Sequence, residues 1–353
     1  MRQIAFGVPG DLATATGGYV YDRRIITELR QLGWLVSALN LGEGYPWPSQ
    51  ATRAVAQAQL ESVPDNDPII IDGLAFGVLP DVAFKLRERH PLVALVHLPL
   101  ALEVGLSAQQ TALLRESERA ALQSAARVIV TSNTTARHLV AHYGVISELV
   151  VVAPPGVDRA PMARGSSNSV VQLLSIGAVV PGKGFDLLVR ALATLSELPW
   201  RLWIVGDRTR DVGTVAALDD AIARFGLAER IKMFGSVGRR RLEEFFDGAD
   251  LFVLASRYES YGMAYTEAIA HGLPIIGTTA GAIPETIPAG AGLLVPPDDQ
   301  DALAFALRCL IEGPEERLKI AAGARRAICQ LPNWVDAARA FARSLDTLPL
   351  DAN

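Results

Sequence analysis

Short apolar runs alternate with longer amphipathic segments along the whole chain. The runs are continuous rather than alternating in polarity, which is typical of parallel strands buried on both faces. The segments between them carry apolar residues at helical spacing. This order of strands and helices predicts an α/β protein with doubly wound parallel sheets. Strands are expected at 4–8, 35–39, 69–71, 92–97, 128–131, 149–152, 171–176, 201–205, 230–234, 251–254, 274–277 and 292–295.

The composition changes near the middle of the chain, which suggests two domains. Pro154, Pro155 and Gly156 are followed by a stretch rich in Gly and Ser, as expected for a connection. We therefore predict an N-terminal Rossmann-like domain over 1–157, a linker over 158–169 and a C-terminal domain over 170–331. Residues 334–345 have apolar positions at helical spacing, so the segment 332–353 is expected to pack back on the first domain.

Charge and cysteine content narrow the class of protein. The 33 basic and 38 acidic side chains leave a net charge of −5, which argues against a nucleic-acid partner held by its phosphates. The two cysteines lack metal-binding spacing and are too few for a disulfide framework. The first apolar run is too short for a signal-peptide core, and no run is long enough to span a bilayer. We expect a cytoplasmic protein that could rest against the inner face of a membrane.

In each half of the chain, a glycine-containing loop follows the first strand. After the first strand come Gly7 to Gly10 and then Gly17-Gly18, with a helix expected from about Val20. Glycines between a strand and a helix let N–H groups approach an anion, although they are often needed only for steric reasons. The order is not G-x-G-x-x-G, and no acidic residue ends the second strand, so a dinucleotide site is not indicated. Binding and steric roles both stay open for this loop.

The second loop, 177–184, comes within one residue of the phosphate-loop pattern G-x-x-x-x-G-K-[ST]. Gly184 lacks the hydroxyl that would hold magnesium, and Pro181 removes an N–H from the loop. A phosphate-loop nucleotidase is therefore disfavoured. Because Lys183 lies at a strand–helix junction of an open sheet, we favour an anion-binding lysine over a solvated loop lysine.

The segment 256–274 holds the most informative chemistry. It follows a buried strand, and a helix is expected to begin near Tyr261 and to end at Gly272. Glu259 then precedes the helix and Glu267 lies in its early turns. Carboxylates accept hydrogen bonds from the paired hydroxyls of a ribose or a hexose. The N–H groups of Gly262 and Met263 at the helix start could meet a diphosphate without a metal ion.

This arrangement resembles a known family. Two glutamates eight residues apart, then A-x-x-x-G-x-P and the sequence GAIPE at 281–285, are similar to the retaining nucleotide-sugar glycosyltransferases of family four (glycosyl transferases group 1). The agreement covers nearly the whole chain, including the loops at 17–18, 155–158, 177–184, 235–237 and 292–298. The resemblance implies the GT-B fold, in which two Rossmann-like domains face a cleft.

The resemblance also implies roles for individual residues. Lys183 would neutralise the donor diphosphate, Glu259 would hold the transferred sugar, and Glu267 would bind the ribose. His97, at the end of the fourth strand, would lie near the sugar and the acceptor. Further donor contacts would come from Gly17, Gly18, Ser236, Val237, Tyr261, Gly262, Met263 and Ala264.

Two positions need separate weighing. Relatives often carry an arginine where this chain has Ala178, so Arg257, Arg208 or the helix terminus would have to supply that charge. Without the resemblance, His97 would be interpreted as a hydrogen-bonded core residue; its position at a strand end before Pro99 favours a site.

No metal site is predicted. Asp65-Asn66-Asp67 imitates a D-x-D metal motif, but it precedes a strand instead of following one, and it is interpreted as a turn. The expected co-substrate is a nucleotide diphosphate sugar, with no separate cofactor.

The leading hypothesis is therefore a retaining, metal-independent glycosyltransferase. It would move a hexose from a nucleotide diphosphate sugar to a hydroxyl of a glycan, a lipid-linked acceptor or a lipid. The alternatives are a GT-B sugar-nucleotide epimerase and a non-catalytic protein that binds a sugar nucleotide. Basic residues on expected helices, such as Arg23 and Lys85, could meet anionic lipid, but acidic residues are interleaved with them. The nucleotide base, the acceptor and the oligomeric state are not readable from the sequence.

Overall fold

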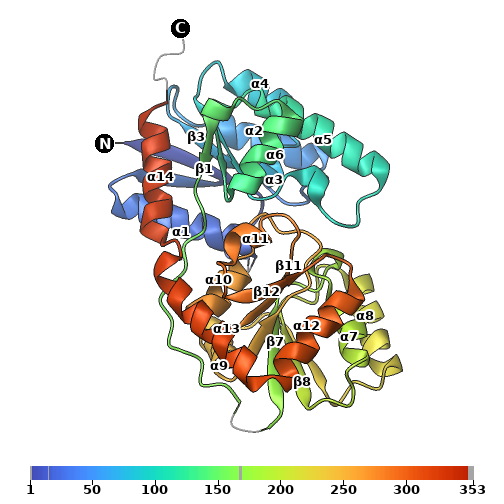
Figure 1. The fold of residues 1–353 in the computed structure, drawn as a ribbon. Helices are drawn as coiled ribbons and strands as arrows, with labels where there is room; N and C mark the ends of the chain where they lie inside the picture. The colour runs from blue at the N-terminus through green and yellow to red at the C-terminus, as the bar shows by residue number, and fades with distance from the viewer. Residues whose placement is uncertain (1, 15, 167–168, 349–353) are drawn as a thin grey trace. The chain divides into compact units, whose positions relative to one another are not determined.

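The apolar runs predicted as strands form strands in the structure (Figure 1). The computed structural model describes residues 2–14, 16–166 and 169–348. It divides into two compact units: unit 1 comprises 1–156 with 332–353, and unit 2 comprises 157–331. Each unit has one six-stranded sheet, and all the strand pairs are parallel. The prediction of two doubly wound parallel α/β sheets is confirmed.

The sheet of unit 1 has the strand order β2-β1-β3-β4-β5-β6. Its central strands β3 and β4 are buried along their whole length because helices cover both faces. Its strands are β1 (Gln3–Val8), β2 (Leu35–Asn40), β3 (Ile69–Asp72), β4 (Leu92–Val96), β5 (Arg127–Val130) and β6 (Val150–Val152).

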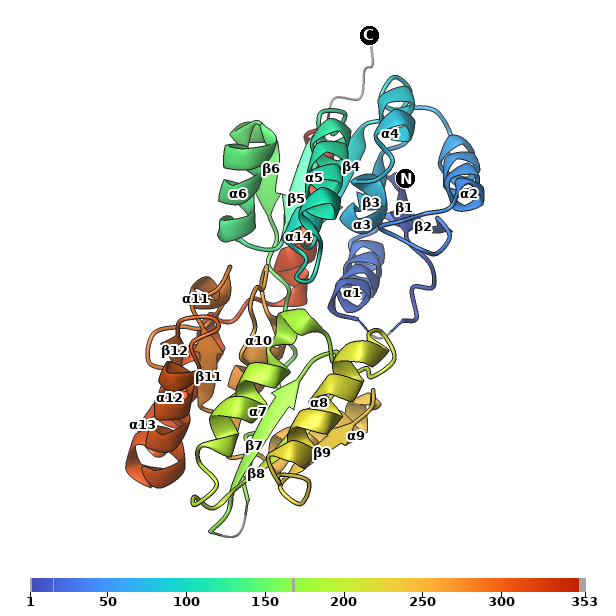
Figure 2. The same ribbon diagram turned by 90° about the vertical axis from the view of Figure 1, so that its right-hand side faces the viewer.

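The helices of unit 1 fall into two groups that pack among themselves. One group holds α1 (Gly17–Gln31) and α14 (Trp334–Asp346), which lie side by side (Figures 1 and 2). The other group is α2 (Gln50–Glu61), α3 (Gly73–Phe76), α4 (Pro80–Leu86), α5 (Ala108–Leu122) and α6 (Asn133–Tyr143). Two short 3-10 turns, Leu100–Leu102 and Ser147–Leu149, complete the unit.

The chain leaves and re-enters unit 1 at one place. A Cβ on Gly156 would overlap the backbone of Asn333 and Trp334, so only glycine allows this close approach. From there α14 buries Trp334 and Phe341 against the ring of Tyr21 on α1, at ring separations of 5.8 and 6.1 Å. The C-terminal helix is thus part of the core of unit 1.

The sheet of unit 2 has the strand order β12-β11-β10-β7-β8-β9. Its core is a continuous cluster of buried aliphatic and aromatic side chains on both faces of the sheet. The strands are β7 (Val171–Ile176), β8 (Trp200–Val205), β9 (Ile231–Phe234), β10 (Leu251–Val253), β11 (Ile275–Thr278) and β12 (Gly292–Val295).

The helices of unit 2 also pack as two layers. Figure 2 shows α7 (Phe185–Ala193) and α8 (Val212–Arg224) side by side, and α12 (Gln300–Glu312) packs on α7. On the other face α10 (Met263–Ala270) packs on α13 (Pro314–Ala327). The remaining elements are α9 (Arg239–Asp247), α11 (Ile283–Thr286) and the 3-10 turns Pro181–Lys183 and Ile328–Gln330.

The segment expected to be a linker is bonded to unit 2. The Ala163 N–H donates to the carbonyl of His271 (2.8 Å), and the Ser166 N–H donates to Asp250 (2.9 Å). Residues 163–166 are therefore fixed on unit 2 instead of spanning freely between domains, which corrects the predicted linker; 167 and 168 lie outside the described residues.

Within the described ranges, no helix combines the length and apolar character that crossing a bilayer requires.

Candidate functional site

Each sheet has one place where the order of its strands reverses, and ligands of open α/β sheets bind beyond the strand ends there. In unit 2 this place lies between β7 and β10, and in unit 1 between β1 and β3. Lys183 follows β7 and Glu259 follows β10. His97 directly follows β4, the neighbour of β3. Lys183 and Glu259 thus follow the two strands that flank the reversal in unit 2, and His97 follows a strand next to the reversal in unit 1.

The loop that carries Lys183 has a shape unlike a phosphate loop. Residues 181–183 form a 3-10 turn, and Gly184 then adopts a left-handed conformation (φ 65°). A Cβ at Gly184 would overlap the carbonyl oxygen of Ala255, so serine or threonine has no room here. This packing explains why the loop departs from the nucleotidase pattern. It also leaves no room for the hydroxyl side chain that would hold magnesium in a phosphate loop.

Lys183 and Glu259 meet directly. The Lys183 ammonium lies 2.6 Å from Oε1 of Glu259, and the Ser256 hydroxyl donates to the same oxygen at 2.7 Å. An ammonium has three N–H donors and a carboxylate has two accepting oxygens. The described residues take one donor of Lys183, and they form no hydrogen bond with Oε2 of Glu259. The pair therefore keeps donors for an anion and an acceptor for hydroxyl groups.

The loop between β10 and α10 is held rigidly from behind. The Tyr265 hydroxyl donates to the carbonyl of Leu254 (2.8 Å), and Thr278 donates to that of Ser256 (2.7 Å). Thr286 donates to the carbonyl of Tyr261 (2.6 Å). Bonds of this kind fix a loop before a ligand arrives, which lowers the entropy cost of binding.

The start of α10 presents free backbone N–H groups. Gly262 is its N-cap in the left-handed region (φ 91°), where a β-carbon would be strained. No side chain caps the helix, so the first-turn N–H groups of Met263 and Ala264 have no acceptor within it. The predicted helix start near Tyr261 is two residues early, and Tyr261 itself is buried.

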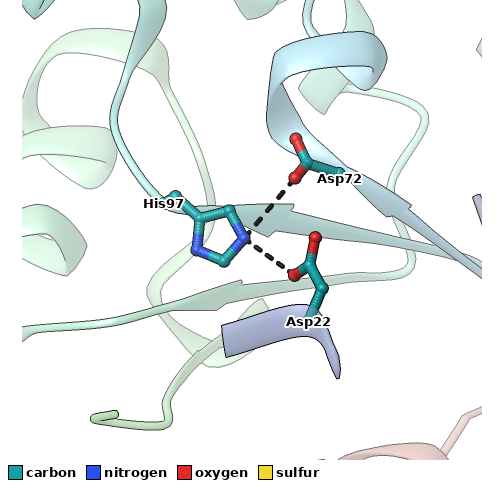
Figure 3. A group of neighbouring side chains, drawn as sticks. All are labelled: Asp22, Asp72 and His97. Carbon is teal, nitrogen blue, oxygen red and sulfur yellow. Dashed lines mark hydrogen bonds and ion pairs between the residues drawn. The ribbon is translucent and has the colours of Figure 1, made fainter. Parts of the chain in front are cut away.

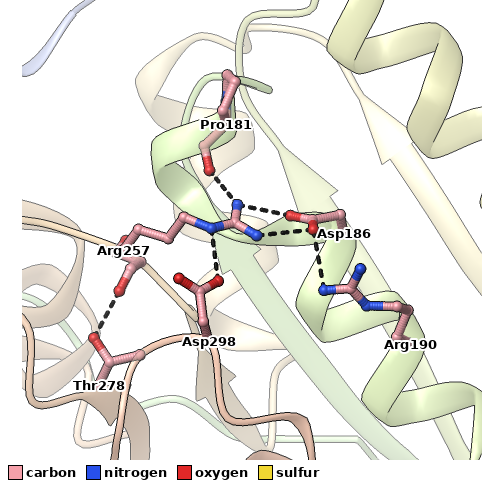
Figure 4. A network of polar contacts seen from close by, with 7 residues as sticks. Pro181, Asp186, Arg190, Arg257, Thr278 and Asp298 are labelled. Atoms are coloured by element: carbon pink, nitrogen blue, oxygen red, sulfur yellow. Dashed lines mark hydrogen bonds and ion pairs between the residues drawn. The ribbon is translucent and has the colours of Figure 1, made fainter. Parts of the chain in front are cut away.

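Arg257, one proposed substitute for the missing arginine at 178, is already engaged (Figure 4). Its guanidinium bonds both oxygens of Asp186 (2.9 Å each), Asp298 (2.7 Å) and the carbonyl of Pro181 (2.5 Å). It therefore ties the Lys183 loop to the loop after β12. The other proposed substitute, Arg208, pairs at 3.1 Å with Asp219, whose side chain is half exposed.

Glu267 lies on α10 among charged groups from other elements. Burial raises the pKa of its carboxyl to about 7; the nearby Arg239 lowers this pKa and Asp158 raises it. Arg239 in turn bonds Asp158 at 3.0 Å. A carboxyl with such a pKa changes its charge near neutral pH and can exchange a proton on ligand binding.

Ser236 and Val237 follow β9 in an open loop. Ser236 is exposed, and Val237 is half buried against the core of unit 2. A Cβ at the preceding Gly235 would meet no atom within 4 Å. Both residues lie beyond the end of β9, and within the described residues neither bonds to Lys183 or Glu259.

In unit 1 the two early glycines belong to a helix and not to a turn. The helix α1 begins at Gly17, three residues before the predicted start, because the Thr16 side chain caps it by accepting from the Tyr19 N–H. Gly17 and Gly18 thus lie in the first turn, whose N–H groups point out of the helix. A Cβ on Gly18 would touch the His97 ring at 3.4 Å, so His97 and the glycines are close neighbours.

His97 is bound by two carboxylates that the sequence did not indicate (Figure 3). Its Nε2 lies 2.9 Å from Oδ1 of Asp22 on α1 and 3.5 Å from Oδ2 of Asp72 at the end of β3. Burial alone would lower the pKa of His97, but the charge and hydrogen bond of Asp22, with the charge of Asp72, raise it to about 9. Burial and the neighbouring Asp22 raise the pKa of Asp72 to about 7.

Among the residues that the structure describes, these three are also the group of potential ligands whose spacing could hold a metal ion. Their ligand atoms lie within 4.8 Å of one another. The 2.9 Å hydrogen bond from Nε2 already accounts for the closest pair.

Sequence signals for the two aspartates existed. Asp72 ends a buried strand, and Asp22 shares the apolar face of α1 with Ile25, Ile26 and Leu29, where a charge is unexpected. By contrast, nothing in the residue pattern indicated that Ser256 would bond Glu259.

Two family models match the chain in succession. The one described as Glycosyltransferase Family 4 matches residues 23–160, and the one described as Glycosyl transferases group 1 matches residues 163–327.

Curated relatives match about half of their own length. The D-inositol 3-phosphate glycosyltransferase of Kineococcus radiotolerans is 30% identical over 236 residues, which cover 59% of this chain and 54% of the relative. That of Streptomyces avermitilis is 31% identical over 239 residues, which cover 62% and 51%. The chain thus spans about half the length of the curated relatives it matches.

Solved structures share the fold over the full length. A sucrose-phosphate synthase from Thermosynechococcus elongatus matches with a TM-score of 0.83 and 21% identity, covering 99% of both chains. Anabaena HepE in complex with UDP-glucose matches with a TM-score of 0.79 and 21% identity, covering 99% of this chain and 100% of that one. Models of two glycosyltransferase families thus follow each other along most of the sequence, the second being that of the glycosyl transferases group 1, and the solved structures share the GT-B fold over the full length.

Proposed function

We propose that this protein is a retaining glycosyltransferase that moves a hexose from a nucleoside diphosphate sugar to an acceptor hydroxyl without a metal ion. The observation that carries the proposal is the direct pairing of Lys183 with Glu259 where the strand order of unit 2 reverses. The pair joins a cation suited to a diphosphate with an acceptor suited to sugar hydroxyls. HepE, a GT-B neighbour solved with UDP-glucose, supports a donor of this class.

The diphosphate would be held by two sources of positive charge in unit 2. Lys183 supplies a full charge, and the uncapped start of α10 supplies N–H groups and the positive end of the helix dipole. Glu267 would accept from the ribose hydroxyls, and Glu259 Oε2 from the sugar. Charge on the leaving group would then be stabilised by fixed protein groups, which favours metal-independent transfer.

Transfer with retention would proceed on one face of the sugar. The acceptor oxygen forms a bond to the anomeric carbon while the bond from that carbon to the diphosphate oxygen breaks. The proton of the acceptor hydroxyl passes to the departing phosphate oxygen. The protein then contributes by positioning and charge stabilisation, and no side chain has to form a covalent intermediate.

The first test is binding of nucleoside diphosphates followed by thermal shift, with EDTA present throughout. One of UDP, GDP and ADP should raise the melting temperature, because it binds only the folded protein. Lys183→Ala should lose this shift and reduce turnover by two or more orders of magnitude while remaining folded. Lys319→Ala is the matched control, since its side chain is 75% exposed on α13 and its partner in the described chain is Glu316 on the same helix.

The second test is the stereochemistry of the product. NMR of the transferred sugar should show the same anomeric configuration as the donor, at a rate unchanged by EDTA. An inverted product, product formed from donor alone, loss of activity in EDTA, or wild-type turnover in Lys183→Ala would each contradict the proposal.

A further inference from the structure

We propose that Asp22 and Asp72 hold His97 as a fixed imidazolium, so that its Nδ1–H donates a hydrogen bond to a ligand oxygen and His97 does not act as a general base. The inference concerns the charge of one side chain. It rests on the proposed function only for the identity of the ligand, a sugar hydroxyl or a phosphate oxygen.

The geometry brings one ring nitrogen against two carboxylates. Nε2 of His97 lies 2.9 Å from Asp22 Oδ1 and 3.5 Å from Asp72 Oδ2. Asp22 is fully buried and Asp72 is 4% exposed. The second oxygen of Asp22, Oδ2, is buried without a hydrogen-bond partner among the described residues. Asp72 Oδ1 is occupied, because it accepts from the Leu74 N–H at 2.7 Å.

Protonation of His97 offsets the negative charge of the two aspartates, which is otherwise unpaired. A buried carboxylate is costly unless it is paired, and two adjacent carboxylates repel each other. Among the described residues neither aspartate forms an ion pair with Lys or Arg, so His97 is the cation available to both. The pKa values agree: the aspartates raise that of His97 to about 9, and burial with Asp22 raises that of Asp72 to about 7.

The other neighbours of the ring that the described part of unit 1 supplies are uncharged. On α1 the Tyr21 ring meets the imidazole edge-on at 5.2 Å, and Gly18 approaches its Cδ2 atom. The Tyr21 hydroxyl donates to the carbonyl of Ala153 at 2.8 Å, so the ring is fixed in place. Among the described residues of unit 1, the titratable groups that face His97 are therefore Asp22 and Tyr21 from α1 and Asp72 from the end of β3.

The orientation decides what the free side of His97 can do. Figure 3 shows Nδ1 on the side of the ring away from both carboxylates. The side chain is 19% exposed. In a neutral imidazole whose Nε2–H is given to Asp22, Nδ1 would be a lone pair and a possible base. In the imidazolium both nitrogens are donors, so Nδ1 binds an oxygen lone pair and cannot take a proton.

The test is NMR of the full-length protein with ¹⁵N-labelled histidine, titrated from pH 5.5 to 9.5 without any ligand. Comparison with His97→Asn assigns the signal. Both ring nitrogens of His97 should show the protonated chemical shift up to at least pH 8. His90, His138 and His271, whose pKa values are lowered chiefly by burial, should lose their protons below about pH 6.5. This measurement on the wild type needs no variant to fold.

Two variants then test the cause. Asp22→Asn should lower the pKa of His97 by one unit or more, and Asp72→Asn by less, because its oxygen is farther away. Asp81→Asn, an exposed carboxylate on α4, should leave it unchanged. If transfer activity is present, the alkaline limb of the kcat/KM profile should move down with the His97 signal in Asp22→Asn.

Three results would overturn the inference. The first is a neutral His97 at pH 7, and the second is an unchanged His97 pKa in Asp22→Asn. The third is a divalent metal site: micromolar Mn²⁺ or Zn²⁺ that broadens or shifts the His97 signal and removes its Nε2 proton. None of these readouts uses a nucleotide sugar, so failure of the proposed function, seen as absent binding or turnover, stays distinguishable from failure of this inference.

Discussion

At the residue scale, Glu267 links burial to ligand binding. Burial raises the pKa of its carboxyl to about 7, so the group is largely protonated at pH 6 and largely ionised at pH 8. A ribose offers two hydroxyl donors, which an ionised carboxylate accepts better than a carboxylic acid does. If Glu267 binds the ribose, donor affinity must depend on its charge.

We therefore expect affinity for the stabilising nucleoside diphosphate to rise between pH 6 and 8, by at most tenfold per pH unit. Glu267→Gln should bind about tenfold more weakly at pH 8 and lose this slope. The ratio of wild-type to variant Kd, measured by calorimetry, cancels the titration of the ligand's own phosphate. Glu244→Gln, a half-exposed carboxylate on α9, should keep the wild-type profile. A slope that survives in Glu267→Gln would assign the proton to another group.

The same scale shows what the sequence could and could not predict of the site. Lys183 and Glu259 were predictable because each follows a buried strand next to glycines, and backbone topology brings such positions together. Asp22 and Asp72 were missed because their meeting with His97 depends on how α1 lies over the strand ends. Side-chain pairing was also not readable from the sequence: Arg257, one of the candidates for the diphosphate, is paired with Asp186 and Asp298.

At the element scale, the turn after β4 depends on α5 for its position. Glu118 of α5 is buried, and its Oε2 accepts from the N–H of Leu100 at 2.9 Å, three residues beyond His97. Burial raises the pKa of this carboxyl to about 8, while the Leu100 N–H and the Tyr143 hydroxyl lower it. The carboxyl thus remains mostly protonated at neutral pH in the folded chain.

This pKa predicts a pH-dependent loss of stability. Between the ordinary value of 4.5 and about 8, the unfolded chain has released the proton that the folded chain still holds. The free energy of unfolding must therefore fall as pH rises through this window, by at most about 1.4 kcal/mol per pH unit from this group. Glu118→Gln keeps an oxygen for Leu100 and does not titrate. In urea unfolding at pH 5, 6, 7 and 8, the free energy of unfolding of the variant should rise relative to that of the wild type at each step.

Glu116→Gln, at an exposed position of the same helix, is the control. Its free energy of unfolding should depend on pH in the same way as that of the wild type. A constant difference between wild type and Glu118→Gln across pH 5–8 would show that Glu118 is ionised throughout.

The elements themselves were predicted closely, with errors at helix starts. Apolar runs locate the ends of a buried strand to within about one residue, because both faces of the strand need apolar side chains. The start of α1 was misplaced by three residues because Gly17 and Gly18 look like turn residues. The cap at Thr16 shows that they are the first turn of the helix. A pair of glycines therefore does not by itself distinguish a turn from the first turn of a helix; the capping residue before it does.

At the scale of the whole molecule, the chain builds unit 1 from its two ends. Residues 1–156 are completed by the C-terminal segment 332–353, and each unit has its own hydrophobic core. Tyr21 connects the two parts of unit 1: its ring contacts Phe341 and Trp334 of α14 on one side and His97 on another. The last helix therefore supports the position of His97, although almost 240 residues separate them in sequence.

Phe341→Ala should expose this dependence without affecting the donor-binding residues of unit 2. Phe341 is fully buried, and its loss should cost roughly 3–5 kcal/mol. In a unit of this size that lowers the melting temperature of unit 1 by about 6–20 °C. Calorimetry should show this loss in one transition, while the nucleoside diphosphate still stabilises the other and binds with its wild-type Kd. The His97 NMR signal should shift, because Tyr21 loses a neighbour.

Val335→Ala on the same helix is the control, since that side chain is 40% exposed and should change neither transition by more than about 2 °C. A weakened Kd with an unshifted His97 signal would mean that α14 acts on unit 2 and not through Tyr21.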